Sequence, residues 1–280
     1  MPSPTGPLHA GSLATALASW LDARAAGGAW IIRIEDLDPP RSVPGAAERI
    51  VEVLARCGLE SDESVVFQSA RRELYEAAFA RLQAAGLIYG CSCSRRDVDE
   101  VIEAQARWPA RVYPRTCATG AAPDKPLRAY RVRVPDEPLG FVDRAAGPYA
   151  QHLARDVGDF VVKRADGLWA YQLAVVVDDA EQRITDIVRG TDLLDNTPRQ
   201  IYLQRALGLP TPRYLHVPLV LNAAGEKLSK QSGAAEIDPT RPLAALNRAA
   251  LHLGMPEFAP NSTEGFLRLA TDAWREHRCA

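Results

Sequence analysis

The first dozen residues constrain this chain more than any other stretch. They read Pro2-Ser3-Pro4-Thr5-Gly6-Pro7-Leu8-His9-Ala10-Gly11-Ser12. The prolines exclude a regular helix over this stretch, and the glycines allow the backbone to approach a neighbouring group closely. Ser12 stands where a helix N-cap is expected, and apolar residues follow at helical spacing from Leu13 to Leu21. A histidine-bearing loop therefore opens onto a helix N-terminus, which is a favourable place for an anion.

A second segment, far downstream, carries two lysines on a loop headed by a glycine. After the apolar strand pattern of residues 215–221, the chain continues as Asn222-Ala223-Ala224-Gly225-Glu226-Lys227-Leu228-Ser229-Lys230-Gln231. Two ammonium groups on such a loop can neutralise charge on a phosphate during its transfer. His9 could donate to a phosphate oxygen, and Gly11 leaves room for an adenine or ribose. Taken alone, each segment has an ordinary alternative: a proline–glycine loop and a solvated basic turn.

Composition and charge indicate a globular protein without an obvious nucleic-acid-binding charge. The 280 residues are 47% hydrophobic and 24% charged, with a formal net charge of -2. Any basic footprint must therefore be local, and the arginines at 95–96, 111–115 and 128–133 are candidates for contacting phosphates. No apolar run has transmembrane length and no secretory pattern is visible. We expect a cytoplasmic monomer with no membrane partner.

Alternating strand and helix patterns indicate an α/β fold with a doubly wound parallel sheet. Residues 30–34 read as a buried strand, and residues 69–85 read as a helix with Leu74, Ala78 and Leu82 on one face. We expect the two halves of a nucleotide-binding fold at 1–85 and 176–240, an insertion at 86–175 and a helical segment at 241–280. Three acids, Glu35, Asp36 and Asp38, follow the strand at its carboxyl end, where α/β proteins usually bind ligands.

The insertion has an α+β pattern and a cysteine cluster. An Asp166-Gly167 turn between apolar runs at 160–164 and 168–177 predicts a β-hairpin. Cys91, Cys93 and Cys117 place three thiols within 27 residues, a spacing that suits a structural zinc site better than disulfides in a reducing compartment. Tyr113, His152 or water could be the fourth ligand. The alternative is three buried free cysteines.

Together, the two loop segments resemble the signature pair of class I aminoacyl-tRNA synthetases. His9-Ala10-Gly11-Ser12 is similar to the HIGH element, and Lys227-Leu228-Ser229-Lys230-Gln231 is similar to the KMSKS loop. The stretches at 32–38, 173–179 and 187–190 resemble glutamyl-tRNA synthetases. The compact length and the Cys-x-Cys…Tyr-x-x-x-Cys segment are similar to the glutamyl-queuosine tRNA(Asp) synthetases, compact paralogues of that family with a Rossmann-like fold and an inserted zinc-containing segment.

This resemblance implies an activity and a set of site residues. The chain would activate L-glutamate with ATP and Mg²⁺ in the absence of tRNA, and then transfer it to the queuosine base in the anticodon stem-loop of tRNA(Asp). His9 and Lys230 would be catalytic, and they would bind ATP together with Gly11, Ser12 and Lys227. Glutamate would be bound by Ser3, Glu35, Tyr171 and Arg189. One structural zinc ion would be held by Cys91, Cys93, Tyr113 and Cys117.

The sequence departs from the family pattern at its first residue. The family has an arginine, one further residue and an alanine before Pro-Ser-Pro, and here Met1 occupies the alanine position. We expect the native start to lie upstream, where it would restore that glutamate-binding arginine. Three other interpretations stay open: a clipped ordinary glutamyl-tRNA synthetase, a non-catalytic tRNA-binding paralogue, and a small-molecule ligase or nucleotidyltransferase that shares the fold.

Overall fold

The structure, a computed structural model, describes residues 3–105, 112–222, 225, 228 and 236–279, with side chains as far as 276. The chain divides into two compact units. Unit 1 comprises Met1–Ala70, Asp186–Leu194 and Tyr214–Ala280, and unit 2 comprises Arg71–Thr185 and Asp195–Arg213. Each unit is therefore assembled from separate stretches of the sequence.

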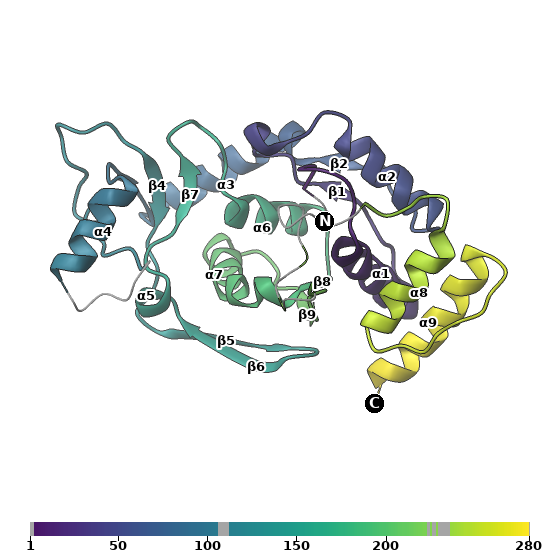
Figure 1. Cartoon of the computed structure of the whole chain (residues 1–280). Helices are drawn as coiled ribbons and strands as arrows, with labels where there is room; N and C mark the ends of the chain where they lie inside the picture. The colour runs from purple at the N-terminus through teal and green to yellow at the C-terminus, as the bar shows by residue number, and fades with distance from the viewer. Residues whose placement is uncertain (1–2, 106–111, 223–224, 226–227, 229–235, 280) are drawn as a thin grey trace. The chain divides into compact units, whose positions relative to one another are not determined.

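Unit 1 combines helices with two small two-stranded sheets (Figure 1). Strand β1 pairs in parallel with β2, and β8 pairs with β9. Three elements, η2, η3 and β9, contain residues of both units. In chain order, the elements are α1 (Ala10–Ala25), β1 (Arg33–Ile34), η1 (Pro39–Arg41), α2 (Ala46–Arg56), β2 (Val66–Phe67), η2 (Gln68–Arg71), β8 (Asp186–Gly190), η3 (Thr191–Asn196), β9 (Arg213–Val217), α8 (Pro242–His252) and α9 (Thr263–Cys279).

Helix α1 is the centre of the hydrophobic core of unit 1. Its buried face carries Leu13, Leu17 and Leu21 at the helical spacing that the sequence predicts. These side chains belong to one cluster with residues of β1, α2, β8 and β9, and α8 and α9 lie beside α1 (Figure 1). Each large aliphatic side chain buried in this way contributes about 1.5–3 kcal/mol. The core therefore fixes α1, and with it the loop that precedes it.

The start of α1 differs from the sequence prediction. His9, and not Ser12, is the N-cap, with an extended backbone (φ -118°, ψ 169°) and a ring nitrogen that accepts from the Ser12 amide. The imidazole therefore accepts the backbone hydrogen bond that a serine hydroxyl usually accepts at an N-cap. Ser12 lies in the first turn of the helix.

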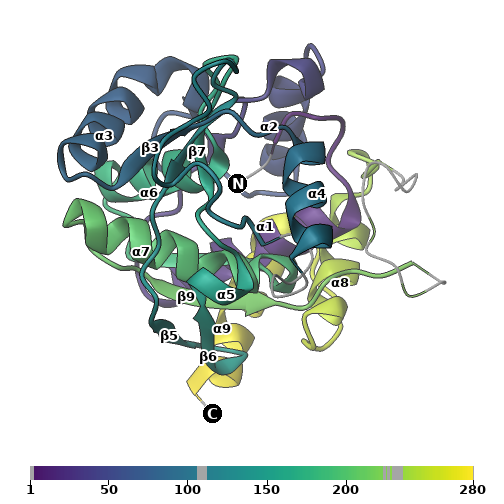
Figure 2. The ribbon, with the colours of Figure 1, turned by 90° about the vertical axis from the view of Figure 1, so that its left-hand side faces the viewer.

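Unit 2 contains a three-stranded antiparallel sheet of order β3-β4-β7 and a separate hairpin, β5-β6 (Figure 2). Its elements are α3 (Arg72–Ala84), β3 (Ile88–Cys91), α4 (Arg95–Ala104), β4 (Ala129–Val132), β5 (Pro138–Asp143), β6 (Gly147–His152), α5 (Leu153–Asp156), β7 (Val161–Arg164), α6 (Tyr171–Glu181) and α7 (Thr197–Leu207). The sequence analysis missed the β5-β6 hairpin. Its turn is made by Asp143, whose carboxylate accepts from the amides of Ala145 and Ala146, and by Gly147 at φ 76°.

The predicted hairpin at Asp166-Gly167 is only half correct. The turn itself is confirmed: the Arg164 amide donates to Leu168 O at 2.8 Å, and Gly167 has a φ of 84°. The predicted strand at 168–177 is wrong, because Trp169 alone pairs with Lys163 and the helix α6 begins at Tyr171. The run of valines is buried on every side, and periodicity does not distinguish such a helix from a buried strand.

The α/β content is confirmed, but the strands are shorter than the sequence predicts. Within the described ranges they form four small sheets and not one continuous doubly wound sheet. The helical segment predicted at 241–280 is confirmed, because it contains α8 and α9. In the part of the chain that the structure describes, no helix has the length and apolar character needed to cross a membrane.

The buried face of α3 is rotated from the predicted one, because Tyr75 is buried with Ala78 and Leu82 whereas Leu74 is at the surface. We predict that Leu82→Ala, at a side chain with 0% exposure, lowers the free energy of unfolding by about 2–5 kcal/mol. The matched change Leu74→Ala, at 36% exposure on the same helix, should cost less than about 1 kcal/mol. Urea unfolding measures both, and equal losses would contradict this helix register.

Candidate functional site

His9 is held against the first turn of α1 by Ser12. The Ser12 amide donates to His9 Nδ1 at 3.4 Å, and Ser12 Oγ lies 3.0 Å from His9 Nε2. Because Nδ1 accepts, the neutral ring carries its proton on Nε2 and donates to the hydroxyl. The imidazole is half-buried over a helix N-terminus, where the free amides and the helix dipole favour a phosphate or carboxylate.

The histidine loop is tied to residues from near the other end of the chain. His9 forms an antiparallel bridge with Glu236, and the Ile237 amide donates to Leu8 O at 3.0 Å. A Cβ on Gly11 would lie 3.3 Å from His9 Cε1 and 3.6 Å from the Leu228 carbonyl oxygen. Glycine at this position therefore permits the close approach of the His9 ring, whereas the distance to Leu228 is an ordinary contact.

Of the two predicted lysines, Lys227 comes directly before Leu228 in the sequence, and Lys230 lies between Leu228 and Glu236. Lys227 and Lys230 lie outside the described residues. Their sequence neighbour Leu228 is described, and its amide donates to Val220 O at 2.8 Å. The sequence between Leu228 and Glu236 therefore has both of its flanks at the N-terminal end of α1.

The three acids after β1 separate into different roles. Asp36 accepts from the amide and the hydroxyl of Ser69, at 2.8 and 2.6 Å. Asp38 forms an ion pair with Arg41 at 2.6 Å. Glu35 is half-buried directly after β1 and is the acid of the three that the family resemblance assigns to glutamate binding.

The other residues expected to bind the amino acid are distributed over both units. Ser3 is an exposed residue of the N-terminal loop, and its carbonyl accepts from the Thr5 amide. Ser3, Glu35 and Arg189 belong to unit 1, whereas Tyr171 is the first residue of α6 in unit 2.

Arg189 is a buried cation near the end of β8. Its Nε donates to Nε2 of His216 on the neighbouring strand β9 at 3.0 Å, and its guanidinium carbon lies 5.4 Å from the ring centre of Tyr214. A guanidinium held in this way suits a carboxylate, which it can bind through two parallel hydrogen bonds. Sequence reasoning missed His216 and Tyr214, because both are part of an apolar strand pattern and no local motif distinguishes them.

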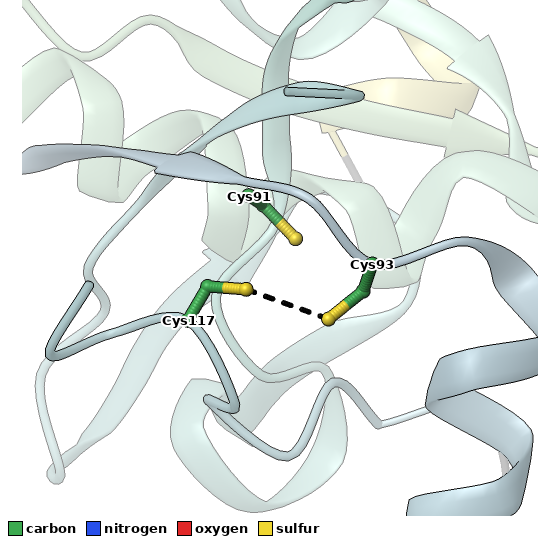
Figure 3. A group of neighbouring side chains, drawn as sticks. All are labelled: Cys91, Cys93 and Cys117. Atoms are coloured by element: carbon green, nitrogen blue, oxygen red, sulfur yellow. Dashed lines mark hydrogen bonds between the residues drawn. The ribbon is translucent and has the colours of Figure 1, made fainter. Parts of the chain in front are cut away.

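The three cysteines of the insertion come together, as predicted. Figure 3 shows their side chains converging, with Cys91 at the end of β3. The Sγ atoms of Cys91, Cys93 and Cys117 all lie within 4.8 Å of one another, and those of Cys93 and Cys117 are 3.5 Å apart. Among the described residues this is the one group of cysteine, histidine and acidic side chains that could hold a metal ion.

The hydroxyl of Tyr113 lies beside these sulfurs. Its Oη is 3.3 Å from Cys91 Sγ and 3.8 Å from Cys93 Sγ, and it accepts from the Cys117 amide at 3.0 Å. His152, the other candidate, is not part of the group: its Nε2 faces Asp136 at 3.4 Å. Of the two side chains considered from the sequence, Tyr113 therefore has the position of a fourth ligand.

The electrostatics of the cluster favour one thiolate. Burial opposes ionisation of Cys117, but hydrogen bonds from the Ser92 backbone, from Tyr113 and from Cys93 lower its pKa to about 6. Burial and the hydrogen bond to Cys117 raise the pKa of Cys93 to about 12. Since metal ions bind deprotonated thiols, a cation held here would displace the remaining protons.

Three of the arginines considered as phosphate contacts form hydrogen bonds within the protein. Arg115 donates to the carboxylate of the buried Asp159, Arg131 donates to its carbonyl, and Arg133 donates to Ala118 O. Arg131 also stacks on Tyr113, with its guanidinium carbon 3.6 Å from the ring centre. These three side chains therefore support the cysteine segment, and phosphate contacts by the arginines at 95–96, 111–115 and 128–133 stay a prediction.

Comparison with known proteins shows which family the chain belongs to. The family described as tRNA synthetases class I (E and Q), catalytic domain, matches residues 1–241. A Burkholderia mallei (strain ATCC 23344) protein named Glutamyl-Q tRNA(Asp) synthetase is 60% identical over 279 residues, covering 98% of this chain and 94% of that protein. A protein of the same name from Ralstonia nicotianae (strain ATCC BAA-1114 / GMI1000) is 57% identical, covering 100% and 90%.

A solved structure agrees with this assignment. It is a glutamate tRNA ligase from Elizabethkingia meningosepticum CCUG26117 in complex with its amino acid, with a TM-score of 0.79 and 26% identity. It covers 95% of this chain, which in turn covers 63% of that ligase. The fold, the histidine loop and the sequence similarity agree, and the chain belongs to the class I tRNA synthetases of the glutamate and glutamine (E and Q) family.

Proposed function

We propose that this chain activates L-glutamate with ATP and transfers it to the queuosine base in the anticodon loop of tRNA(Asp). The choice of substrates rests on the relatives named Glutamyl-Q tRNA(Asp) synthetase, which are 57–60% identical over nearly their whole length. The ATP and the tRNA that this reaction consumes are cytoplasmic, so we place the enzyme there.

The structural observation that supports activation is the meeting of two segments far apart in sequence. Leu228, within the Lys-Leu-Ser-Lys stretch, approaches Gly11, and Glu236 pairs with His9. A histidine, the amides of a helix N-terminus and a lysine-bearing segment are the groups that a triphosphate needs.

The reaction follows from the positioning of charges. A carboxylate oxygen of glutamate attacks the α-phosphorus of ATP, the bond to the bridging oxygen breaks, and pyrophosphate leaves with Mg²⁺. His9 would turn its Nε2 proton from Ser12 Oγ to a phosphate oxygen. With Lys230, it would stabilise negative charge that develops on the phosphate oxygens, with Ser12 and Lys227 as further contacts. The protein forms no covalent bond, so its contribution is orientation and electrostatic stabilisation.

Recognition of glutamate is assigned to four side chains. Arg189 would pair with a substrate carboxylate, Glu35 would accept from the ammonium group, and Tyr171 and Ser3 would add hydroxyl contacts. An arginine buried to 7% exposure favours a charged partner over the neutral amide of glutamine. The enzyme would therefore select glutamate in the activation step.

A structural zinc ion is the proposed occupant of the cysteine cluster. Zn–S bonds of about 2.3 Å place two sulfurs at neighbouring tetrahedral corners ~3.8 Å apart. The 3.5 Å between Cys93 Sγ and Cys117 Sγ is close to that value, and Tyr113 Oη lies at comparable distances from two sulfurs. The three thiols would supply sulfur ligands and Tyr113 the oxygen ligand, and the bound ion would cross-link β3 to the loop that carries Cys117.

We predict that the chain catalyses glutamate-dependent exchange of pyrophosphate into ATP in the absence of tRNA, with little exchange for glutamine or aspartate. We also predict that it attaches radiolabelled glutamate to tRNA(Asp) that carries queuosine. Lys230→Ala is the matched inactive variant, and it should lower the exchange rate by about 100-fold or more, as the loss of a donor to transition-state charge does.

The choice of tRNA that accepts the labelled glutamate distinguishes this proposal from a second candidate function. The similarity to a glutamate tRNA ligase favours, as a second candidate, an ordinary glutamyl-tRNA synthetase. Labelling of tRNA(Glu) at its 3′ end, or equal labelling of tRNA(Asp) with and without queuosine, would establish the ordinary synthetase instead.

We predict one zinc ion per chain in freshly purified protein, measured by elemental analysis. Cys93→Ala should reduce the zinc content several-fold and unfold the cysteine segment at a lower temperature, because structural zinc contributes directly to folding. Cys57→Ala, at a buried free thiol in unit 1, is the matched control and should retain the metal. Protein that contains no zinc would end this assignment.

We predict that Gly11→Ala lowers the activation rate about 10- to 100-fold while the fold survives. The added Cβ would lie 3.3 Å from the His9 ring, which would have to shift by a few tenths of an ångström, and small displacements of reacting groups are costly in rate. Gly28→Ala is the control beyond the other end of α1, because its Cβ would meet only an ordinary contact at 3.5 Å. An unchanged exchange rate in Gly11→Ala would show that this close approach is irrelevant to catalysis.

A further inference from the structure

The buried arginine of β8 has a neighbour to which nothing so far assigns a role. His216 lies on β9 with 1% exposure, and its Nε2 accepts from Arg189 Nε at 3.0 Å. An imidazole accepts at Nε2 only when it is neutral with its proton on Nδ1. The contact therefore fixes both the tautomer of the histidine and the rotation of the guanidinium about its long side chain.

Tyr214 completes this arrangement two residues before His216 on the same strand. Its ring is nearly parallel to the imidazole, with an interplanar angle of 13° and a centroid distance of 6.3 Å. The Arg189 guanidinium carbon lies 5.4 Å from the Tyr214 ring centre. Alternate side chains of a strand point to the same face, so β9 presents the two rings together to the guanidinium.

We propose that His216 is a positioning residue that orients Arg189 for the carboxylate of the substrate. The inference rests on the proposed function, in which Arg189 binds glutamate. An arginine side chain has many rotamers, and holding its Nε lets the Nη edge meet a carboxylate without first losing that freedom. A neutral acceptor serves this purpose, because it anchors the cation without cancelling its charge.

Three substitutions test the role of His216. His216→Leu removes the acceptor, and His216→Asn keeps a polar group whose oxygen stops short of Nε. His216→Gln places an amide oxygen near the position of Nε2 and restores an acceptor. Pyrophosphate exchange gives the KM for glutamate, the KM for ATP and kcat for each variant, and thermal unfolding reports whether each one is folded.

We expect the glutamate KM to rise about tenfold or more in His216→Leu and His216→Asn, since the lost hydrogen bond involves a charged group. The ATP KM should change less than about twofold, and His216→Gln should remain within about threefold of the wild-type glutamate KM. His252→Gln, on α8, is a control at a histidine of the same unit that contacts Pro218 O and not Arg189.

Several outcomes would overturn the inference. A folded His216→Asn or His216→Leu with a wild-type glutamate KM would show that Arg189 needs no support. Parallel increases in the KM values for both glutamate and ATP, or failure of His216→Gln to restore binding, would show a general structural role. Wild-type protein that exchanges no pyrophosphate with glutamate would reject the proposed function itself, which separates that failure from the others.

Discussion

Backbone pairing joins the N-terminal loop to the segment at Glu236 and Ile237, and so holds the start of α1 in unit 1. The Ile237 amide donates to Leu8 O directly before the cap of the helix, and the cap residue His9 bridges Glu236. The first loop therefore has two anchors: the hydrophobic core through α1, and the late segment through these contacts. Because both anchors are backbone or core features, the His9 ring and the helix amides are positioned before a ligand arrives, which lowers the entropy cost of binding.

Unit 2 depends on a buried carboxylate in a comparable way. Asp159 is fully buried, and it accepts from the Tyr89 hydroxyl, the Arg115 guanidinium and the Val134 amide. A buried charge is tolerated only when its hydrogen bonds are made, so these partners converge on one point. That convergence brings β3, β4 and the chain around Cys117 together. The hydrogen bonds to Asp159 thus help to position the cysteine cluster, and the spacing of the cysteines in the sequence does not predict them.

The sequence predicts the parts of this molecule that depend on local chemistry. The α1 face, the Asp166-Gly167 turn and the meeting of the three cysteines were all predictable, because helical spacing, turn glycines and thiol chemistry act locally. The helix at α6 was predicted as a strand because its valines are buried on all sides. The cap at His9 was missed because an imidazole rarely takes the place of a serine.

The long-range polar contacts were beyond prediction for a different reason. Arg131 and Arg133 look like a basic patch in sequence, yet their partners are the carbonyls of Asp159 and Ala118, which only the fold brings near. The contact between Arg189 and His216 likewise joins two strands whose separate patterns carry no sign of it. Charged side chains on a strand have no preferred partner in sequence, so their roles follow from the tertiary structure.

The two parts of the proposed reaction place different demands on rigidity, and the structure of unit 1 reflects this. The groups for the triphosphate lie on a loop and a helix end. In the proposed reaction, charge would build and move there. The two described residues that flank Lys230 in sequence, Leu228 and Glu236, both lie close to this end of α1. The group proposed for the amino-acid carboxylate lies on a strand, held by a neighbouring strand. Discrimination between glutamate and glutamine depends on a fixed charge, and a buried arginine with an oriented guanidinium meets that need better than a loop residue would.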